Sequence, residues 1–212
     1  MRTGTLLLLV ALLSATTGHD YEQPALPTPA ALALAMRGLS DTAFAQAATA
    51  ITAATAAGPE IPKLFWVTMK HVHKLPNIRE VADRHPKWLL TIVDDANMNR
   101  FFDVVYANTS MLWAFKAVHP AIGAAKADLF RYAVLYAFGG VYFDADTTFA
   151  GNLDEYIKPT DRFVWASEGN PMGDCYQPWY PLSKTPSFNS DRSILQWMLM
   201  SAPQVRGEPP TE

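Results

Sequence analysis

Several features that define other protein classes are scarce in this chain of 212 residues. It has one cysteine, Cys175, which excludes an internal disulfide framework and a zinc site built from cysteines. Charged residues make up 17% of the chain, below the roughly 25% typical of soluble domains, and the formal net charge is -3. Without an excess of basic residues, no nucleic-acid partner is expected. The length suits one globular domain with appendages.

The N-terminal apolar run is too short for an ordinary spanning helix. It extends from Leu6 to Leu13, follows Arg2 and precedes the small residues Ser14 to Gly18. This order is typical of a secretory signal peptide, whereas a spanning helix needs roughly 20 apolar residues. We therefore expect residues 1–18 to be a signal peptide or short membrane anchor that places the rest in the secretory lumen. The glycosylation sequon Asn108-Thr109-Ser110 fits that location.

A segment poor in bulky apolar residues follows. Residues 19–59 are rich in Ala, Pro and Thr and hold few charges. Such a composition cannot build a core, so we expect a stem or spacer. Gly58-Pro59 marks its end, and residues 60–212 are expected to form the globular domain.

Short apolar segments in this domain predict strands, and the segments between them predict helices. The expected strands are Leu64–Val67, Trp88–Val93 and Val141–Phe143, and the expected helices are Asp95–Phe102, with Asp95 as N-cap, and Ala121–Phe138, ended by Gly139-Gly140. This alternation predicts an α/β fold with a mostly parallel sheet flanked by helices. In such sheets ligands bind beyond the carboxyl ends of the strands.

Two carboxylates follow the last of these strands. Asp144 and Asp146 are two residues apart, so on an extended segment their side chains point the same way. Adjacent carboxylates repel each other unless a cation lies beside them. Mg²⁺ and Mn²⁺ favour oxygen ligands, often one or two carboxylates with substrate phosphates. The pair therefore indicates a metal site, and a solvated acidic turn is the alternative.

The helix before this pair is apolar except for Lys126, Asp128 and Arg131. A helix that is apolar nearly all round is buried, and buried charges need partners. Asp128 and Arg131 lie at i and i+3 and could pair with each other. They could also reach the site, where an acceptor carboxylate and a guanidinium would hydrogen-bond a sugar.

Together these segments resemble glycosyltransferase family 32. The likeness rests on Ala125-Lys126-Ala127-Asp128-Leu129-Phe130-Arg131-Tyr132, on Gly139-Gly140-Val141-Tyr142-Phe143-Asp144-Ala145-Asp146 and on the opening Ile61-Pro62-Lys63-Leu64-Phe65-Trp66. That family includes Golgi initiating α-1,6-mannosyltransferases and sphingolipid mannosyltransferases. The spacing of the Asp and Arg residues is also similar to that of the large glucosylating toxins.

The resemblance implies a GT-A fold, a nucleotide-sugar donor, Mn²⁺ or Mg²⁺, and transfer of a hexose with retention of configuration. It implies that Asp146 ligates the metal, and that Asp144 contacts the ribose or the water shell of the metal. Asp128 and Arg131 would hold the hydroxyls of the donor sugar, and Trp66 would lie near the nucleotide base. GDP-mannose or a UDP-sugar would be the donor, a glycan, glycoprotein or glycolipid the acceptor, and the Golgi lumen the location.

Two departures from the family and two alternative functions stay open. The family usually has Ser where Ala127 stands, and it continues beyond the length of this chain. Ser187 to Ser201 resembles a helix of that later half. A truncated or non-catalytic sugar-nucleotide-binding relative is therefore one alternative. The other is a haloacid-dehalogenase-type phosphatase, because Asp144-Ala145-Asp146-Thr147-Thr148 also matches its Asp-x-Asp-x-Thr signature.

Overall fold

The protein is described by a computed structural model, which covers residues 49, 60–70, 76–147, 151–164 and 198–203. A five-stranded sheet, in the order β2-β1-β3-β5-β4, forms the centre of this part of the chain. The strands are β1 (Leu64–Thr68), β2 (Leu89–Val93), β3 (Gly140–Phe143), β4 (Phe163–Val164) and β5 (Met198–Ser201). β1 pairs in parallel with both β2 and β3, whereas β5 runs antiparallel to β3 and β4.

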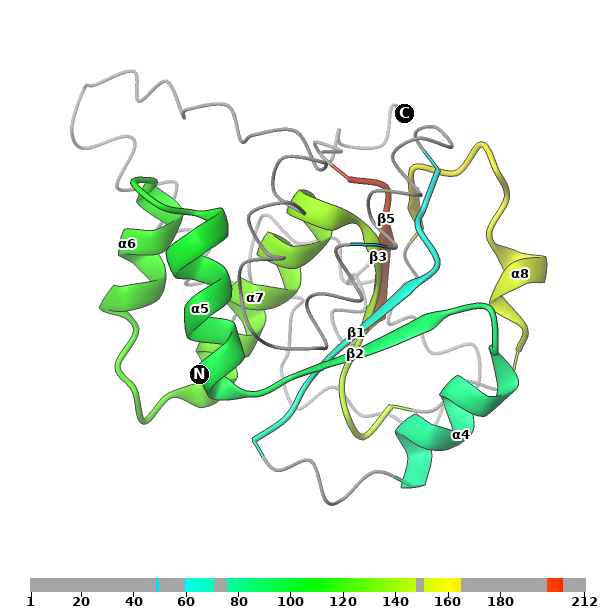
Figure 1. The fold of residues 1–212 in the computed structure, drawn as a ribbon, viewed down its shortest axis with the longest axis horizontal. Helices are drawn as coiled ribbons and strands as arrows, with labels where there is room; N and C mark the ends of the chain where they lie inside the picture. Colours follow the sequence, from blue (N-terminus) through cyan, green and yellow to red (C-terminus); the bar gives the residue numbers. More distant parts are fainter. Residues whose placement is uncertain (1–48, 50–59, 71–75, 148–150, 165–197, 204–212) are drawn as a thin grey trace, which may run out of the picture.

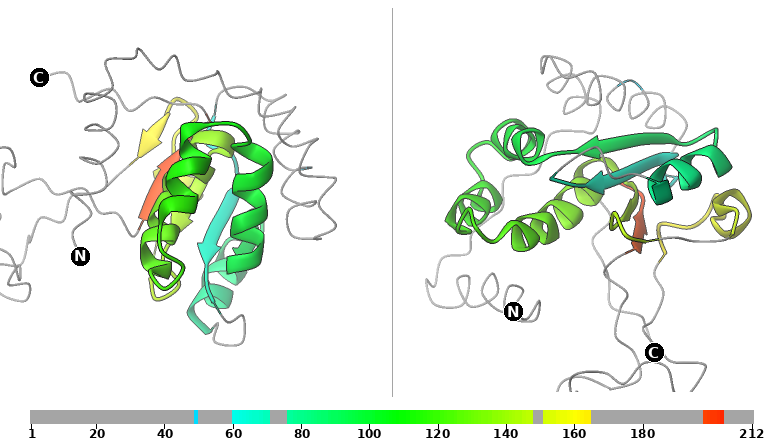
Figure 2. Two further views of the ribbon diagram at one scale, coloured as in Figure 1. Left: turned by 90° about the vertical axis from the view of Figure 1, so that its left-hand side faces the viewer. Right: turned by 90° about the horizontal axis from the view of Figure 1, so that it is seen from below.

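Helices cover both faces of the sheet. One face carries α5 (Asp95–Val105), α6 (Ser110–Ala117) and α7 (Gly123–Phe138), and the other carries α4 (Pro76–Arg84) and α8 (Leu153–Tyr156). Figure 1 shows these two groups on opposite sides of the strands, and the left view of Figure 2 shows α5 and α6 in front of the sheet. The expected α/β architecture is therefore confirmed, but the sheet is mixed, because β5 pairs antiparallel with both of its neighbours.

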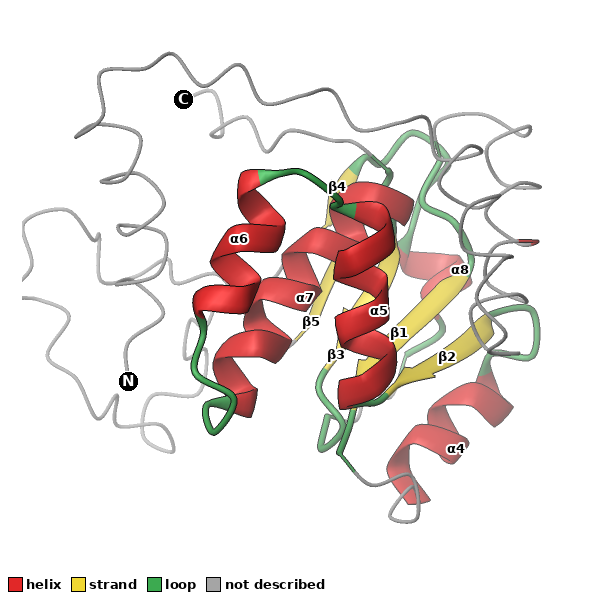
Figure 3. Cartoon of the chain, turned by 60° about the vertical axis from the view of Figure 1, so that its left-hand side comes forward, coloured by secondary structure: helices red, strands yellow, loops and turns green. Residues whose placement is uncertain are grey.

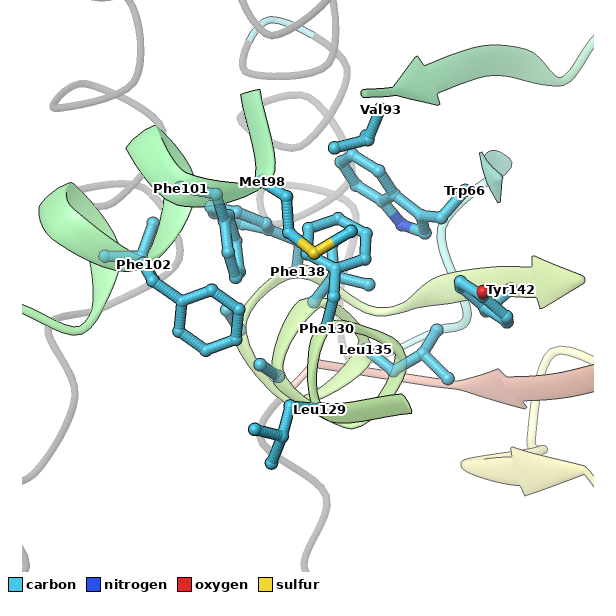
Figure 4. Close-up of a cluster of buried hydrophobic side chains, with 14 of the residues drawn as sticks. Trp66, Val93, Met98, Phe101, Phe102, Leu129, Phe130, Leu135, Phe138 and Tyr142 are labelled. Carbon is cyan, nitrogen blue, oxygen red and sulfur yellow. The ribbon is translucent and has the colours of Figure 1, made fainter. Parts of the chain in front are cut away.

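The alternation of side chains along β1 divides the core into two clusters. Leu64 and Trp66 pack with the aromatic residues of α5 and α7, and Phe65 and Val67 pack with α4 and α8. Successive side chains of a strand point to opposite faces, so a strand buried on both faces reads as a continuous apolar run. Figure 4 shows the first cluster, in which Phe101, Phe130 and Phe138 lie together beside Trp66.

The expected strands and long helix are confirmed with shifts of one or two residues, and two details were wrong. The N-cap of α5 is Asp94, whose carboxylate accepts the N–H of Asn97 at 2.8 Å, so Asp95 is already helical. Met198–Ser201 is strand β5, where a helix was expected, because its backbone pairs with β3. The rest of that expected helix, residues 187–197, lies outside the described residues.

Three of the described helices, α4, α6 and α8, were not expected from the sequence. The Thr109 hydroxyl caps α6 by accepting the N–H of Leu112 at 3.3 Å. The expected signal or anchor, the stem (apart from Thr49) and Cys175 fall outside the described residues. Within the described ranges, no helix has the length and apolar character needed to cross a membrane.

A pair of glycines joins α7 to β3. Both have left-handed backbone, with φ of 68° at Gly139 and 101° at Gly140. A Cβ at Gly140 would lie 2.7 Å from the carbonyl oxygen of Leu64 and 2.9 Å from its Cβ. Only glycine fits this position, because the backbone of β3 approaches β1 directly at the start of the strand.

We expect Gly140→Ala to lower the free energy of unfolding by about 3 kcal/mol or more, because it combines a strained φ with overpacking against backbone. Denaturant unfolding followed by circular dichroism measures the change. Gly123→Ala is the control, since a Cβ there meets nothing within 4 Å. An unfolding midpoint of Gly140→Ala equal to that of Gly123→Ala would contradict the close approach.

Candidate functional site at the carboxyl edge of the sheet

Three parallel strands end at one edge of the sheet, and polar side chains gather there. β1, β2 and β3 are parallel, so their last residues, Thr68, Val93 and Phe143, lie at the same edge of the sheet. Asp144 follows β3 directly, and Asp94 follows β2 and caps α5. The sequence therefore places carboxylates where open α/β sheets bind their ligands.

Arg131 is the centre of this site. Its side chain is 5% exposed, and its Nη2 lies 3.0 Å from Oδ1 of Asp144 and 3.2 Å from Oδ1 of Asp128. Its guanidinium carbon also lies 4.8 Å from the centroid of the Tyr142 ring. A buried cation is tolerated because it is paired with two carboxylates and an aromatic face.

The chain folds these four residues together through two simple periodicities. Asp128 and Arg131 lie three residues apart in α7 and so share one helix face. Tyr142 and Asp144 are two residues apart and point to the same face of the sheet, the face that α7 covers. Arg131 therefore pairs with Asp128, as one of the two alternatives had it, and also with Asp144, while the hydrogen bond to a sugar stays a prediction.

A line of hydroxyl groups supports Asp144 from the strand side. The Tyr142 hydroxyl donates to Oδ1 of Asp144 at 3.2 Å and lies 2.9 Å from the hydroxyl of Thr68. Burial raises the pKa of Tyr142 to about 12, so it stays a neutral donor at physiological pH. Sequence reasoning missed Tyr142 and Thr68, although the two-residue spacing of Tyr142 from Asp144 was a usable signal.

The pKa values reflect the shared burial of these groups. Burial raises the pKa of Asp128, the charge of Asp144 adds to this, and Arg131 opposes it. Burial alone would lower the pKa of Arg131, but Tyr142, Asp144 and Asp128 outweigh it and the pKa is raised. Arg131 therefore stays charged, and its Nε is a buried donor without a hydrogen-bond partner in the described part of the chain.

Asp146 does not lie on an extended segment, which corrects the expected geometry of the acidic pair. The N–H of Thr147 donates to the carbonyl oxygen of Asp144 at 2.9 Å, and this bond closes a turn over Asp144 to Thr147. Asp146 is exposed in this turn, and the Asp144 side chain is 34% exposed. Two accessible carboxylates on one tight turn fit a hard divalent cation, which accepts one or two carboxylates and fills its shell with water and phosphate oxygens.

Trp66 lies in the core, away from the position expected for a residue that stacks on a nucleotide base. Its side chain has no exposed surface, and its indole N–H donates to the carbonyl oxygen of Gly139 at 2.8 Å. Its ring stacks on Phe138, with centroids 6.1 Å apart. In this conformation no surface of the ring is open to a nucleotide base, and the base contact stays a prediction.

A sheet of the open α/β class carries this paired Arg and its carboxylates at its carboxyl edge, where proteins of that class bind their ligands. Comparison with known families narrows this class. Residues 71–164 match the family described as the glycosyltransferase sugar-binding region containing the DXD motif. That range includes Asp128, Arg131, Asp144 and Asp146, so the matched family and the site coincide.

Two curated relatives agree with this match. The initiation-specific alpha-1,6-mannosyltransferase of Schizosaccharomyces pombe is 29% identical over 161 residues, which are 68% of this chain and 37% of that protein. The enzyme of the same name from Candida albicans is 31% identical over 83 residues, 39% of this chain and 21% of that protein. The chain thus spans well under half the length of either relative. No solved structure matches the chain.

Region 71–164 of the chain is therefore similar to the glycosyltransferases that carry a DXD sugar-binding region, in agreement with the resemblance to family 32. The same match favours the glycosyltransferase assignment over the phosphatase alternative.

We expect Arg131→Met to lower the free energy of unfolding by about 2–4 kcal/mol, because it leaves two partly buried carboxylates facing each other without a cation. Thermal or denaturant unfolding measures the loss. Lys116→Met is the matched control: Lys116 pairs with Asp103 at 2.9 Å on the surface, where its side chain is 62% exposed. That change should cost less than about 1 kcal/mol. Equal effects of the two variants would refute the central role of Arg131.

Proposed function

We propose that this chain is a metal-dependent glycosyltransferase that moves a hexose from a nucleotide sugar to a glycan acceptor. The observation that carries this proposal is the ion-paired cluster of Arg131 with Asp128 and Asp144, inside the region that matches the glycosyltransferase family. The α/β sheet with its site at the carboxyl edge is consistent with a GT-A arrangement, and we expect transfer with retention of configuration.

Arg131 and Asp128 are proposed to hold the donor sugar. A hexose is neutral and offers hydroxyls, which donate to carboxylate oxygens and accept from a guanidinium. Asp128 is partly exposed, at 25% of its side chain, and so remains accessible to a sugar hydroxyl. The unpartnered Nε of Arg131 is a further donor that a ligand or a water could satisfy.

Asp144 and Asp146 are proposed to hold Mn²⁺ or Mg²⁺ together with the donor diphosphate. The exposed Asp146 would bind the cation directly. The Asp144 carboxylate would contact the ribose or the water shell of the cation, because its Oδ1 is already bonded to Arg131 and Tyr142. When bound, the cation supplies charge stabilisation to the leaving diphosphate. Tyr142 and Arg131 keep Asp144 oriented for this role.

The named relatives give the best guide to substrates. Both are initiation-specific alpha-1,6-mannosyltransferases, so GDP-mannose is the leading donor and a UDP-sugar the second candidate. By the same reasoning we propose a glycan, glycoprotein or glycolipid as the acceptor. The signal-like N-terminus supports a location in the secretory lumen, most consistent with the Golgi, in an anchored or secreted form.

Titration of GDP and UDP into the full chain by calorimetry, with Mn²⁺ and with a chelator, tests the metal site. We expect one nucleotide to bind only with metal. Substituting a residue that only supports a metal ligand costs about 10–100-fold in metal affinity. Asp146 is the proposed ligand itself, so Asp146→Asn should weaken nucleotide binding by at least about 100-fold. Asp103→Asn is the control, since it changes an exposed carboxylate on α5. If the folded protein binds neither nucleotide in the presence of metal, the proposed enzyme activity is excluded and the chain is a degenerate relative.

The sugar pocket is tested separately with Asp128→Asn. This variant should weaken binding of GDP-mannose (or of the UDP-sugar, if UDP binds) by roughly tenfold or more, the value of a hydrogen bond to a charged group. It should leave binding of the bare nucleotide unchanged. Equal losses of affinity for the bare nucleotide and for the nucleotide sugar would mean that Asp128 does not contact the sugar. Product formation on a mannosyl acceptor then separates an enzyme from a binding protein.

A further inference from the structure

The turn between α5 and α6 combines a glycosylation sequon with an exposed aromatic ring. Asn108-Thr109-Ser110 is the one Asn-x-Ser/Thr triplet in the sequence. Asn108 and Ser110 are exposed, and Trp113 is 60% exposed, on a helix where its neighbour Phe115 is buried. Trp113 therefore presents an apolar ring to solvent near the start of α6.

Asn108 and Trp113 stand at defined positions relative to the start of α6. Thr109 is the N-cap of α6, since its hydroxyl accepts the N–H of Leu112 and its carbonyl accepts the N–H of Trp113 at 3.3 Å. Asn108 therefore precedes the cap, and Trp113 is the fourth residue after it. These are the two positions whose side chains meet across a helix start when both are apolar.

We propose that Asn108 carries an N-linked glycan whose first sugar lies on the exposed indole of Trp113. The first sugar of a glycan has a hydrocarbon face, which can cover an aromatic ring and remove its apolar surface from water. This inference rests on the proposed lumenal location and is independent of any transferase activity of the chain.

The chemistry needs a lipid-linked oligosaccharide diphosphate as donor and the host's lumenal transferase. A bond forms between C1 of the first sugar and Nδ2 of Asn108. The bond from that carbon to the diphosphate oxygen breaks, the diphosphate leaves with the electron pair, and the amide nitrogen gives up one proton. The exposed position of Asn108 leaves room for the product.

The glycan would not obstruct the nucleotide-sugar site. α5 begins at Asp95, directly after the carboxyl end of β2, and ends at Val105 before the Asn108 turn. At 1.5 Å per residue, the 11 residues of α5 separate the two ends by about 16 Å. Figure 3 shows the α5–α6 turn at the end of these helices opposite to the start of α5 and α7.

Asn108 can serve the backbone conformation of the turn without carrying a glycan, so the variants must separate these two roles. Asn108 has a φ of 61°, and Asn tolerates this left-handed conformation better than most residues. Ser110→Ala removes the sequon and keeps Asn108 in the turn. Asn108→Gly removes the acceptor amide and keeps the backbone conformation. Ser110→Thr keeps the sequon and is the positive control.

The experiment expresses the full chain behind a cleavable secretory signal in a eukaryotic host, so that delivery to the lumen does not depend on its own N-terminus. We expect the wild type and Ser110→Thr to lose mass on treatment with peptide:N-glycosidase. Ser110→Ala and Asn108→Gly should lack that mass. A secreted, folded wild-type chain without the glycan would overturn the proposal.

Peptide mass spectrometry after mild oxidation tests the contact with Trp113. Oxidation of Trp113 should rise several-fold in Ser110→Ala and after enzymatic removal of the glycan. Trp88 is an internal reference, because it is 6% exposed and should not change. Equal oxidation of Trp113 with and without the glycan would overturn the placement of the sugar on the indole.

Discussion

The buried charge of Arg131 is the constraint on which the site depends. A guanidinium that is almost wholly removed from water must be compensated, and Asp128, Asp144 and the ring of Tyr142 supply the compensation. Because these partners belong to α7 and to β3, the ion pairs fix the helix against the strand. The position of the acidic turn is therefore set before any ligand arrives, which reduces the reorganisation that binding requires.

Most of the sheet could be predicted from the sequence, because its signals are local. Apolar runs bounded by polar residues identified β1, β2 and β3, and Gly139-Gly140 identified the end of α7. The sparse charges of α7 also pointed to Asp128 and Arg131, since charges on an otherwise apolar helix need partners. The pairing of Arg131 with Asp128 was one of the two possibilities left open, whereas its pairing with Asp144 was not predicted, because it depends on how α7 packs against β3.

Most of the features that the sequence could not provide depend on contacts between distant segments. Met198–Ser201 carries no strong preference, and its pairing with β3 makes it a strand. Asp146 leaves the extended path because a backbone hydrogen bond closes the turn from Asp144 to Thr147. Trp66 has the aromatic character of a base-stacking residue, yet strand alternation directs it toward α7 and buries it. For β5 and Trp66 a non-local partner overrides the local pattern, whereas the turn at Asp146 is closed by a bond within four residues.

The buried position of Trp66 also makes it a spacer between the core and the site. Its indole fills the space between β1 and the end of α7, and its N–H holds the carbonyl of Gly139. α7 carries Arg131 two turns before its end. Gly139 then leads into β3, which is followed by Asp144. The size of one core side chain thus influences the distance between α7 and the acidic turn, so a substitution in the core would change the geometry of the proposed site without touching any of its residues.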